Sequence, residues 1–270
     1  MSGQIERRGA ASGDPVSRRS LSRRDLLLAG VALVALGGIG VVRWRDSGLT
    51  YRDLPNLPAF RELVSGGAIS TASLAVIGLQ GEPSPELAAR VAEVVNDPYA
   101  ALFGGAAMDD ELPIAYFSDF NCPYCRVLEG DLDDVLAADP GLRLVRHELP
   151  LLGRASMSAA KAVLAADLQG EYEAMKARLL RAGLITDEPY LRAVAGPLGL
   201  DADRLLADME GTEVGQRLLT SLALGRTFGI VGTPALVVGR TLVFGAVSAR
   251  TIRQVVSDER ALHTTRETLS

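Results

Sequence analysis

Cys122 and Cys125 are the only cysteines in the 270 residues, and just two positions separate them. They follow an apolar run, Leu112 to Phe117, and open a segment, Pro123 to Ala138, in which apolar residues recur at helical spacing. This pattern predicts a buried strand that leads directly into a helix beginning at the cysteine pair. Since no other cysteine exists to build a disulfide framework, the pair must have a chemistry of its own.

Proline at position 123 suits the first residue of a helix, because its ring fixes a helical φ and its missing N–H would have no partner there. Cys122 then lies at the helix N-terminus, where free amides and the helix dipole stabilise a thiolate. Because the thiolate is the form that attacks disulfides, the sequence predicts Cys122 as the nucleophile. Cys125, about one helical turn further on, is the predicted resolving thiol. This is the pattern of a thiol–disulfide redox site.

A CxxC pair is also half of a zinc site, which is the competing interpretation. Structural zinc needs four ligands, usually a second CxxC or paired histidines. The only histidines are His147 and His263, which are far apart in the chain, and His147 stands in a predicted strand where a structural role is expected. We therefore expect no metal, and no cofactor other than the redox-active cysteine pair.

Composition limits the function classes. Hydrophobic residues make up 48% of the chain, which is ample for one medium-sized core with appended segments. The formal net charge of −5 argues against a general nucleic-acid-binding role.

Residues 1–45 form the predicted export signal or membrane anchor. Paired arginines precede an uncharged apolar run from Leu26 to Val42, and Trp44 follows between two arginines. Positive charge before the run predicts a cytoplasmic N-terminus with the remainder exported. The stretch Ser22–Leu27 resembles a twin-arginine export signal, or is simply a basic region of an arginine-rich chain. Cleavage after the small residues near Gly37 and retention as an anchor both stay open, with retention favoured.

Residues 46–110 are expected to be a linker and an N-terminal extension of unknown role. They contain no chemical motif. The patterns favour a short helix over Ala59–Val64, a strand over Ser73–Leu79 and a helix over Ser84–Val95.

Residues 111–258 carry the predicted redox domain, and residues 259–270 a polar tail. After the cysteine helix comes a strand over Leu142–Leu149, then a helical stretch from about 156 to 228. Within that stretch one helix is expected from Ser158 to Leu180, and others begin at Thr186 or Asp187, Asp201 and Thr212. The expected C-terminal elements are a hairpin of Thr233–Val238 with Thr241–Phe244 and a helix over Ala249–Asp258.

From about Asp97 to Val256 this arrangement resembles the thioredoxin superfamily and, within it, the DsbA-like exported disulfide oxidoreductases. The most specific matches are Phe120–Cys125 and Gly229–Pro234. The resemblance implies an α/β, thioredoxin-like fold with a central mixed sheet flanked by helices, an inserted all-helical subdomain and an N-terminal signal or anchor helix before it. Cys-Pro-Tyr-Cys alone would also match glutaredoxins, but the long helical stretch before Pro234 favours the DsbA-like group.

The resemblance also implies roles for individual residues. In the family, the proline matching Pro234 is cis and lies against the cysteines, and the residue before it, here Thr233, aligns a substrate chain as an extra strand. Many relatives carry a glutamate where this chain has Tyr116, so Asp119 is left either to transfer protons or only to bond turn amides. Tyr124 replaces the histidine of the strongest oxidants, which implies a less oxidising protein.

The predicted function is that of an exported thiol–disulfide oxidoreductase on the periplasmic side of the inner membrane. Its expected partners are cysteine-containing client proteins and a membrane or soluble redox partner, with membrane contact through residues 26–42 if the signal is retained. Nucleic acid is not expected. A periplasmic reductase or isomerase is the alternative enzyme, and a tethered thioredoxin-fold protein for binding or metal assembly is the alternative of another class.

Overall fold

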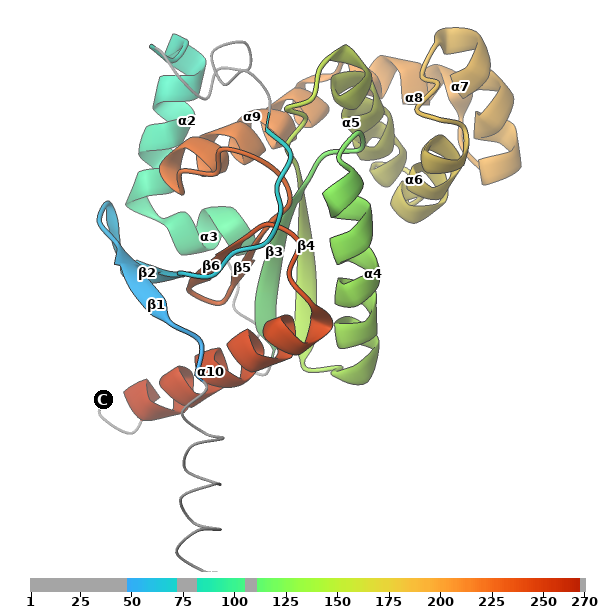
Figure 1. Cartoon of the computed structure of the whole chain (residues 1–270). Helices are drawn as coiled ribbons and strands as arrows, with labels where there is room; N and C mark the ends of the chain where they lie inside the picture. Colours follow the sequence, from blue (N-terminus) through green and yellow to red (C-terminus); the bar gives the residue numbers. More distant parts are fainter. Residues whose placement is uncertain (1–47, 72–81, 105–110, 268–270) are drawn as a thin grey trace, which may run out of the picture. The chain divides into compact units, whose positions relative to one another are not determined.

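A mixed β-sheet organises the part of the chain that the structure, a computed structural model, describes: residues 48–71, 82–104 and 111–267 (Figure 1). Within these residues the sheet has six strands in the order β1-β2-β6-β5-β3-β4. β3 pairs with β4 and β2 with β6 in parallel, whereas the other neighbouring strands are antiparallel.

The strands are β1 (Tyr51–Leu54), β2 (Leu57–Leu63), β3 (Leu112–Ser118), β4 (Leu142–Glu148), β5 (Ala235–Val238) and β6 (Thr241–Phe244). The helices outside the segment between β4 and β5 are α2 (Pro85–Asn96), α3 (Pro98–Phe103), α4 (Pro123–Ala138) and α10 (Ala249–Glu267). Between β4 and β5 come α5 (Arg154–Asp167), α6 (Tyr172–Arg181), α7 (Glu188–Ala195), a 3₁₀ turn (Gly196–Leu198), α8 (Ala202–Met209) and α9 (Thr212–Thr227).

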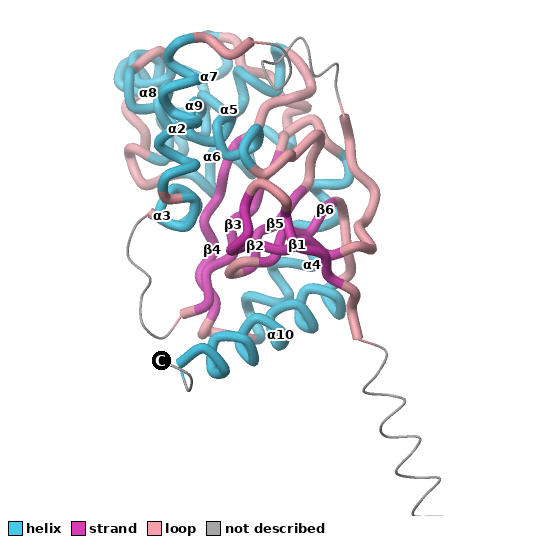
Figure 2. Tube along the Cα trace, turned by 90° about the vertical axis from the view of Figure 1, so that its left-hand side faces the viewer, coloured by secondary structure: helices cyan, strands magenta, loops and turns pink. Residues whose placement is uncertain are grey.

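The strand β3, between β5 and β4, is buried on both faces, which explains its continuous apolar sequence. Ala115 and Phe117 pack with side chains of α2, α3 and α9, whereas Ile114 and Tyr116 pack with those of α4 and α10. Figure 2 shows helices on the two sides of the sheet accordingly. A third cluster of buried side chains belongs to α5–α9, together with Phe120 from the loop before α4.

The short helix expected over Ala59–Val64 is wrong, because this segment belongs to β2. Leu57, Phe60 and Leu63 are its buried residues, and their spacing of three imitates one face of a helix. Pairing decides the outcome: β2 is bonded to β1 on one side and β6 on the other. Part of the segment expected to be a linker is therefore integral to the sheet.

Most of the predicted helix starts are confirmed by capping side chains. Ser84, Asp187 and Asp201 each accept an amide hydrogen bond at the start of α2, α7 and α8. The single helix expected over Ser158–Leu180 is wrong, because the chain turns after α5 with Gly170 at φ 82°. α10 runs to Glu267, well past the expected end at Asp258.

The predicted signal or anchor, including Leu26–Val42, and the strand expected over Ser73–Leu79 lie outside the described residues. Among the residues that are described, no helix combines the length and the apolar character that crossing a bilayer requires.

Phe60 offers a test of whether the β1–β2 hairpin contributes to the fold. Its side chain is 2% exposed and its ring meets that of Phe228 edge to face at 5.0 Å. Phe60→Ala should lower the free energy of unfolding by about 3–5 kcal/mol, because it leaves a cavity between the hairpin and the core. Urea unfolding measures this, with Val64→Ala, 52% exposed, as the control expected to have almost no effect. Equal free energies of unfolding for the two variants would contradict a contribution of the β1–β2 hairpin to the fold.

Candidate active site

Cys122 caps the N-terminus of α4, the position that a serine, threonine or acidic residue usually takes. Its Sγ accepts a hydrogen bond from the amide of Cys125 at 3.2 Å, and Pro123 occupies the first turn as the sequence predicts. The side chain is buried, with no exposed surface in the described structure. The local sequence therefore places an amide of the first turn of α4 within hydrogen-bonding distance of the Cys122 sulfur.

The loop between α9 and β5 approaches the same sulfur from the other end of the chain. The Cys122 sulfur lies 3.3 Å from the carbonyl oxygen of Thr233, to which it donates when protonated, and the bond between Thr233 and Pro234 is cis. The cysteine pair and the Thr233–Pro234 pair, expected to meet only because of the family resemblance, thus lie together. Thr233 is fully buried.

The surroundings of Cys122 favour its thiolate. The thiol of Cys125, which donates to it, contributes most to lowering the pKa of Cys122 to about 5, and hydrogen bonds from the Ser70 hydroxyl and the Cys125 amide add to this. Burial acts in the opposite direction but is outweighed. At neutral pH Cys122 is accordingly a thiolate.

Cys125 has the opposite character. It is 4% exposed, and burial, followed by the hydrogen bond to Cys122, raises the pKa of its thiol far above the usual value. Two neighbouring sulfurs with pKa values moved apart give one nucleophile and one proton-bearing partner.

The supporting residues named from the sequence differ in what they touch. Both carboxylate oxygens of Asp119 accept main-chain amides, from Asn121 at 2.7 Å and from Leu152 at 2.9 Å. These bonds support the turn-bonding alternative for Asp119. Tyr124 is 40% exposed beside the buried cysteines, so its ring is open to a partner.

Behind Cys125 lies a small cavity of about 20 Å³, enough for one water molecule. Its lining includes Cys125, Asp119 and Glu129. Tyr116, in the position where relatives carry a glutamate, donates its hydroxyl to the carbonyl oxygen of Cys125 at 2.9 Å. The tyrosine thus holds the helix turn that carries the second cysteine.

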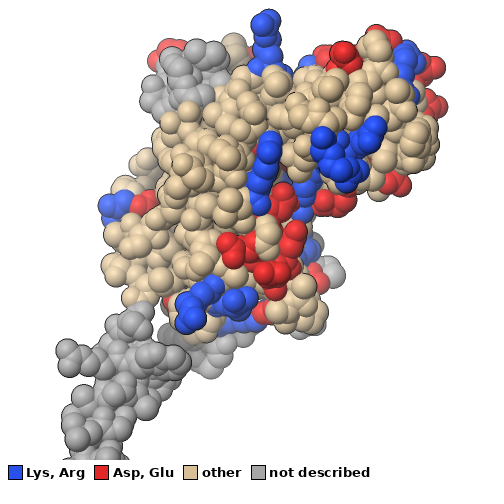
Figure 3. Space-filling view, turned by 45° about the vertical axis from the view of Figure 1, so that its right-hand side comes forward, with Lys and Arg blue, Asp and Glu red and all other residues tan. Residues whose placement is uncertain are grey.

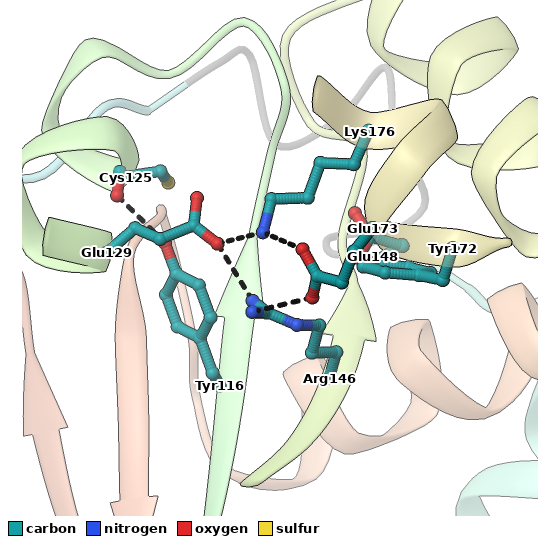
Figure 4. Close-up of polar contacts among 8 residues, drawn as sticks. All are labelled: Tyr116, Cys125, Glu129, Arg146, Glu148, Tyr172, Glu173 and Lys176. Carbon is teal, nitrogen blue, oxygen red and sulfur yellow. Dashed lines mark hydrogen bonds and ion pairs between the residues drawn. The ribbon is translucent and has the colours of Figure 1, made fainter. Parts of the chain in front are cut away.

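A charged cluster adjoins this cavity and joins α4, β4 and α6 (Figure 4). Glu129 of α4 is bonded by Arg146 at 2.9 Å and by Lys176, and both cations also reach Glu173. Tyr172 donates to the buried Glu148, and burial raises the pKa of that carboxyl group to about 7. No local sequence pattern predicts this cluster, because its members come from three separate elements.

Ser70 is the site residue that sequence reasoning missed. Its amide donates to the Thr233 carbonyl at 2.7 Å, and its own carbonyl accepts the Thr233 amide at 3.0 Å. The pair Gly66-Gly67 just before it was the only available signal, since glycines mark close approaches of backbone.

Within the described ranges, no group of three or more His, Cys, Asp or Glu side chains is placed to hold a metal ion. His147 Nε2 donates to the Leu102 carbonyl oxygen at 2.9 Å and its ring stacks on Phe117, and burial lowers its pKa to about 4. These contacts are those of a neutral, structural histidine.

A thiolate that caps a helix beside a cis-proline loop, on a mixed sheet, defines a thioredoxin-like redox protein. Comparison with known proteins agrees. The model of the DSBA-like thioredoxin domain matches residues 113–257. A thioredoxin-like oxidoreductase from Silicibacter pomeroyi is 35% identical, with a TM-score of 0.54 over 60% of this chain and 98% of that one. The catalytic domain of Proteus mirabilis ScsC is 26% identical, with a TM-score of 0.53 over 63% and 98%.

The chain belongs to the DsbA-like thioredoxin-domain family and is a thiol–disulfide oxidoreductase. Proteins of this family act on cysteine-containing substrates together with redox partners. A curated relative, the Na(+)/H(+) antiporter NhaA of Herminiimonas arsenicoxydans, is 26% identical over 87% of this chain. The chain spans only 44% of that relative's length.

The role of the Cys125 thiol can be tested through the acidity of Cys122. Cys125→Ala should raise the pKa of Cys122 above its value of about 5, because the largest stabilising hydrogen bond is lost. The pKa should stay below 9.0, since the helix amide remains. The pH dependence of alkylation by iodoacetamide measures it, with Cys122→Ser as the control for background reaction. An unchanged midpoint would remove Cys125 from the stabilisation.

Glu148 predicts a pH dependence of stability. Its folded-state pKa is raised from 4.5 to about 7, so its stabilising contribution is complete below 4.5 and is lost as the pH rises through 7. Glu148→Gln should abolish this loss, so the difference in melting temperature, variant minus wild type, should increase between those two pH values. Both proteins keep Cys122, whose contribution has the opposite sign and cancels in the difference. A constant difference would contradict the ionisation assigned to Glu148.

Proposed function

We propose that Cys122 and Cys125 are the redox-active pair and exchange disulfides with client proteins in the cell envelope. The observation that carries this proposal is the acidic Cys122 sulfur, held between the N-terminus of α4 and the Thr233–Pro234 loop. A thiolate placed in this way is both a good nucleophile and a good leaving group.

In the oxidising direction the two cysteines begin as a disulfide. A client thiolate attacks Cys122, forms a mixed disulfide and releases Cys125 as a thiolate that takes up a proton. A second client thiolate then attacks the client sulfur of the mixed disulfide and expels Cys122. The client loses two electrons and two protons, and the cysteine pair is left reduced for its redox partner to reoxidise.

In the reducing direction the order is reversed. The Cys122 thiolate attacks a client disulfide, and Cys125 loses its proton and attacks Cys122 to release the reduced client. The raised pKa of Cys125 makes it unreactive until the mixed disulfide is formed beside it. Cys125 is therefore the resolving thiol in this direction.

Stabilisation of the thiolate favours the reduced form of the pair and so gives it oxidising power. The stabilising groups are the thiol and amide of Cys125 and the Ser70 hydroxyl, without the histidine between the cysteines that strong oxidants carry. We place the protein among oxidases of moderate strength. For this two-electron couple, a 30 mV change in potential corresponds to about 1.4 kcal/mol.

The proposed place of action is the periplasmic side of the inner membrane, with residues 1–45 as export signal or anchor.

Acidic and basic side chains are interspersed on the face seen in Figure 3, so that face offers no continuous basic surface for nucleic acid. Sodium/proton exchange is not part of the proposal, since the chain spans less than half of the antiporter relative.

Trapping experiments test the two cysteine roles. Cys125→Ser should accumulate mixed disulfides between Cys122 and clients, because the resolving thiol is missing. Cys122→Ser should form none and should lose exchange activity to background. Non-reducing electrophoresis after incubation with a reduced, unfolded multi-cysteine protein detects the adducts. If trapping is equal in the two variants, or absent from Cys125→Ser, the assigned roles are wrong.

A further inference from the structure

A short segment that follows β2, Gly66 to Thr71, crosses the active site as an additional strand. We call this segment the strap. It can be followed in Figure 1 as the coloured chain that leaves β2 and passes the end of β6. Gly67 donates to the Phe244 carbonyl at 2.7 Å, and the Ala68 carbonyl accepts from Ala246 at 3.0 Å. Two further bonds, described above, join Ser70 to Thr233 in an antiparallel bridge.

Glycines make the close approach of the strap possible. A Cβ atom on Gly67 would lie 1.9 Å from the Ala246 carbonyl oxygen, and one on Gly245 would lie 2.2 Å from the Gly67 oxygen. On Gly232, just before Thr233, it would lie 2.5 Å from the Ser70 oxygen. Backbone is thus packed directly on backbone along the whole strap.

The strap occupies the main-chain groups of Thr233 to which a client strand would bond. Strand addition at the residue before the cis-proline requires the free N–H and C=O of Thr233. Both are bonded to Ser70. The Thr233 carbonyl oxygen also lies 3.3 Å from the Cys122 sulfur, so the strap pairs with the same backbone unit that touches the nucleophile.

The nucleophile itself is covered. Cys122 has no exposed surface although its partners, the Thr233–Pro234 loop and the start of α4, border the site. The hydroxyl of Ser70 bonds to the Cys122 sulfur and contributes to the lowered pKa of that thiol. A client sulfur therefore has no direct approach while the strap is in place.

We propose that the strap is an internal substitute for the client strand, and that a client with an extended cysteine-containing segment reaches Cys122 by displacing it. This inference rests on the proposed function and names how the site is regulated. The closed form keeps the thiolate covered, and the open form exposes Cys122 and the two main-chain groups of Thr233. Only a chain that can pair as a strand replaces the bonds that the strap gives up.

Few contacts hold the strap in place. Gly66, Gly67, Ala68 and Thr71 are exposed, and Ile69 and Ser70 are only half-buried, so little apolar surface holds the segment down. Its fixing contacts are main-chain hydrogen bonds, which a client backbone can replace one for one at Thr233. Segments of this kind open at low free energy while the rest of the fold stays intact.

Substitutions at Ser70 separate the strand pairing from the hydroxyl group. Ser70→Pro removes the N–H that bonds to Thr233, whereas Ser70→Ala keeps both main-chain bonds and loses only the hydroxyl. Ser70→Pro should increase the rate of Cys122 alkylation by iodoacetamide at neutral pH about fivefold or more, because a larger fraction of molecules is open. It should raise kcat/KM for oxidation of an unstructured two-cysteine peptide by a similar factor. Because Ser70→Pro also loses the hydroxyl that bonds to Cys122, its rates are compared with those of Ser70→Ala, which lacks the same hydroxyl but keeps the strap paired.

A steric variant provides an independent opening of the strap. Gly67→Ala should accelerate both reactions because its Cβ collides with the Ala246 carbonyl. Gly215→Ala is the matched control, since nothing lies within 4 Å of the added Cβ at that position in α9. Wild-type rates in both Ser70→Pro and Gly67→Ala would overturn the proposal.

A third measurement avoids any change in the strap. In the mixed disulfide between Cys125→Ser and the peptide, hydrogen exchange should become faster in residues 66–71 than in the uncomplexed variant, while Thr233 stays protected. Unchanged protection of the strap in this adduct would also overturn the proposal. Failure of the wild-type pair to be reduced by dithiothreitol would instead contradict the proposed function itself, so the two failures are distinguishable.

Discussion

The site depends on one sulfur that does the work of a helix-capping oxygen. Cys122 accepts the amide of Cys125 and bonds to the carbonyl of Thr233, so it ties the start of α4 to a loop more than a hundred positions away in the chain. That distance contains β4 and all the helices from α5 to α9. The contact with Thr233 therefore forms only after the helical segment has folded back and β5 has joined the sheet. The groups that contribute most to the acidity of the thiol, the thiol and amide of Cys125, are local, whereas the loop beside the sulfur is brought there by the tertiary structure.

Local chemistry makes one part of this arrangement, the helix α4 that begins at the cysteine pair, predictable from the sequence. Pro123 fixes where α4 begins, and the apolar spacing after it fixes the face that packs on the sheet, so the expected helix matches the observed one from Pro123 to Ala138. The hairpin strand Thr241–Phe244 was predictable for the same reason, because two apolar runs flank a tight turn at Gly239. The position of Thr233 and Pro234 against the cysteines followed from family resemblance and not from the residues alone.

What the sequence concealed is pairing between distant segments. The buried residues of β2 have a helical spacing, and only the neighbours β1 and β6 make the segment a strand. The strap has no periodic hydrophobic pattern. Its glycines are the one feature of its sequence that indicates close packing of backbone on backbone. The raised pKa of Glu148 comes mainly from burial, and the Tyr172 hydroxyl that bonds to it belongs to α6, so no local pattern predicts it.

The burial of Cys122 affects how easily oxidants inactivate the protein. Peroxides oxidise thiolates to sulfenic and then irreversibly to sulfinic acids, and susceptibility follows both thiolate character and accessibility. An acidic sulfur with an open surface would be the most vulnerable atom of the chain in an oxidising compartment. Since Cys122 is buried in the reduced form described here, the protein combines a reactive thiolate with protection from chemical inactivation until its redox partner reoxidises it.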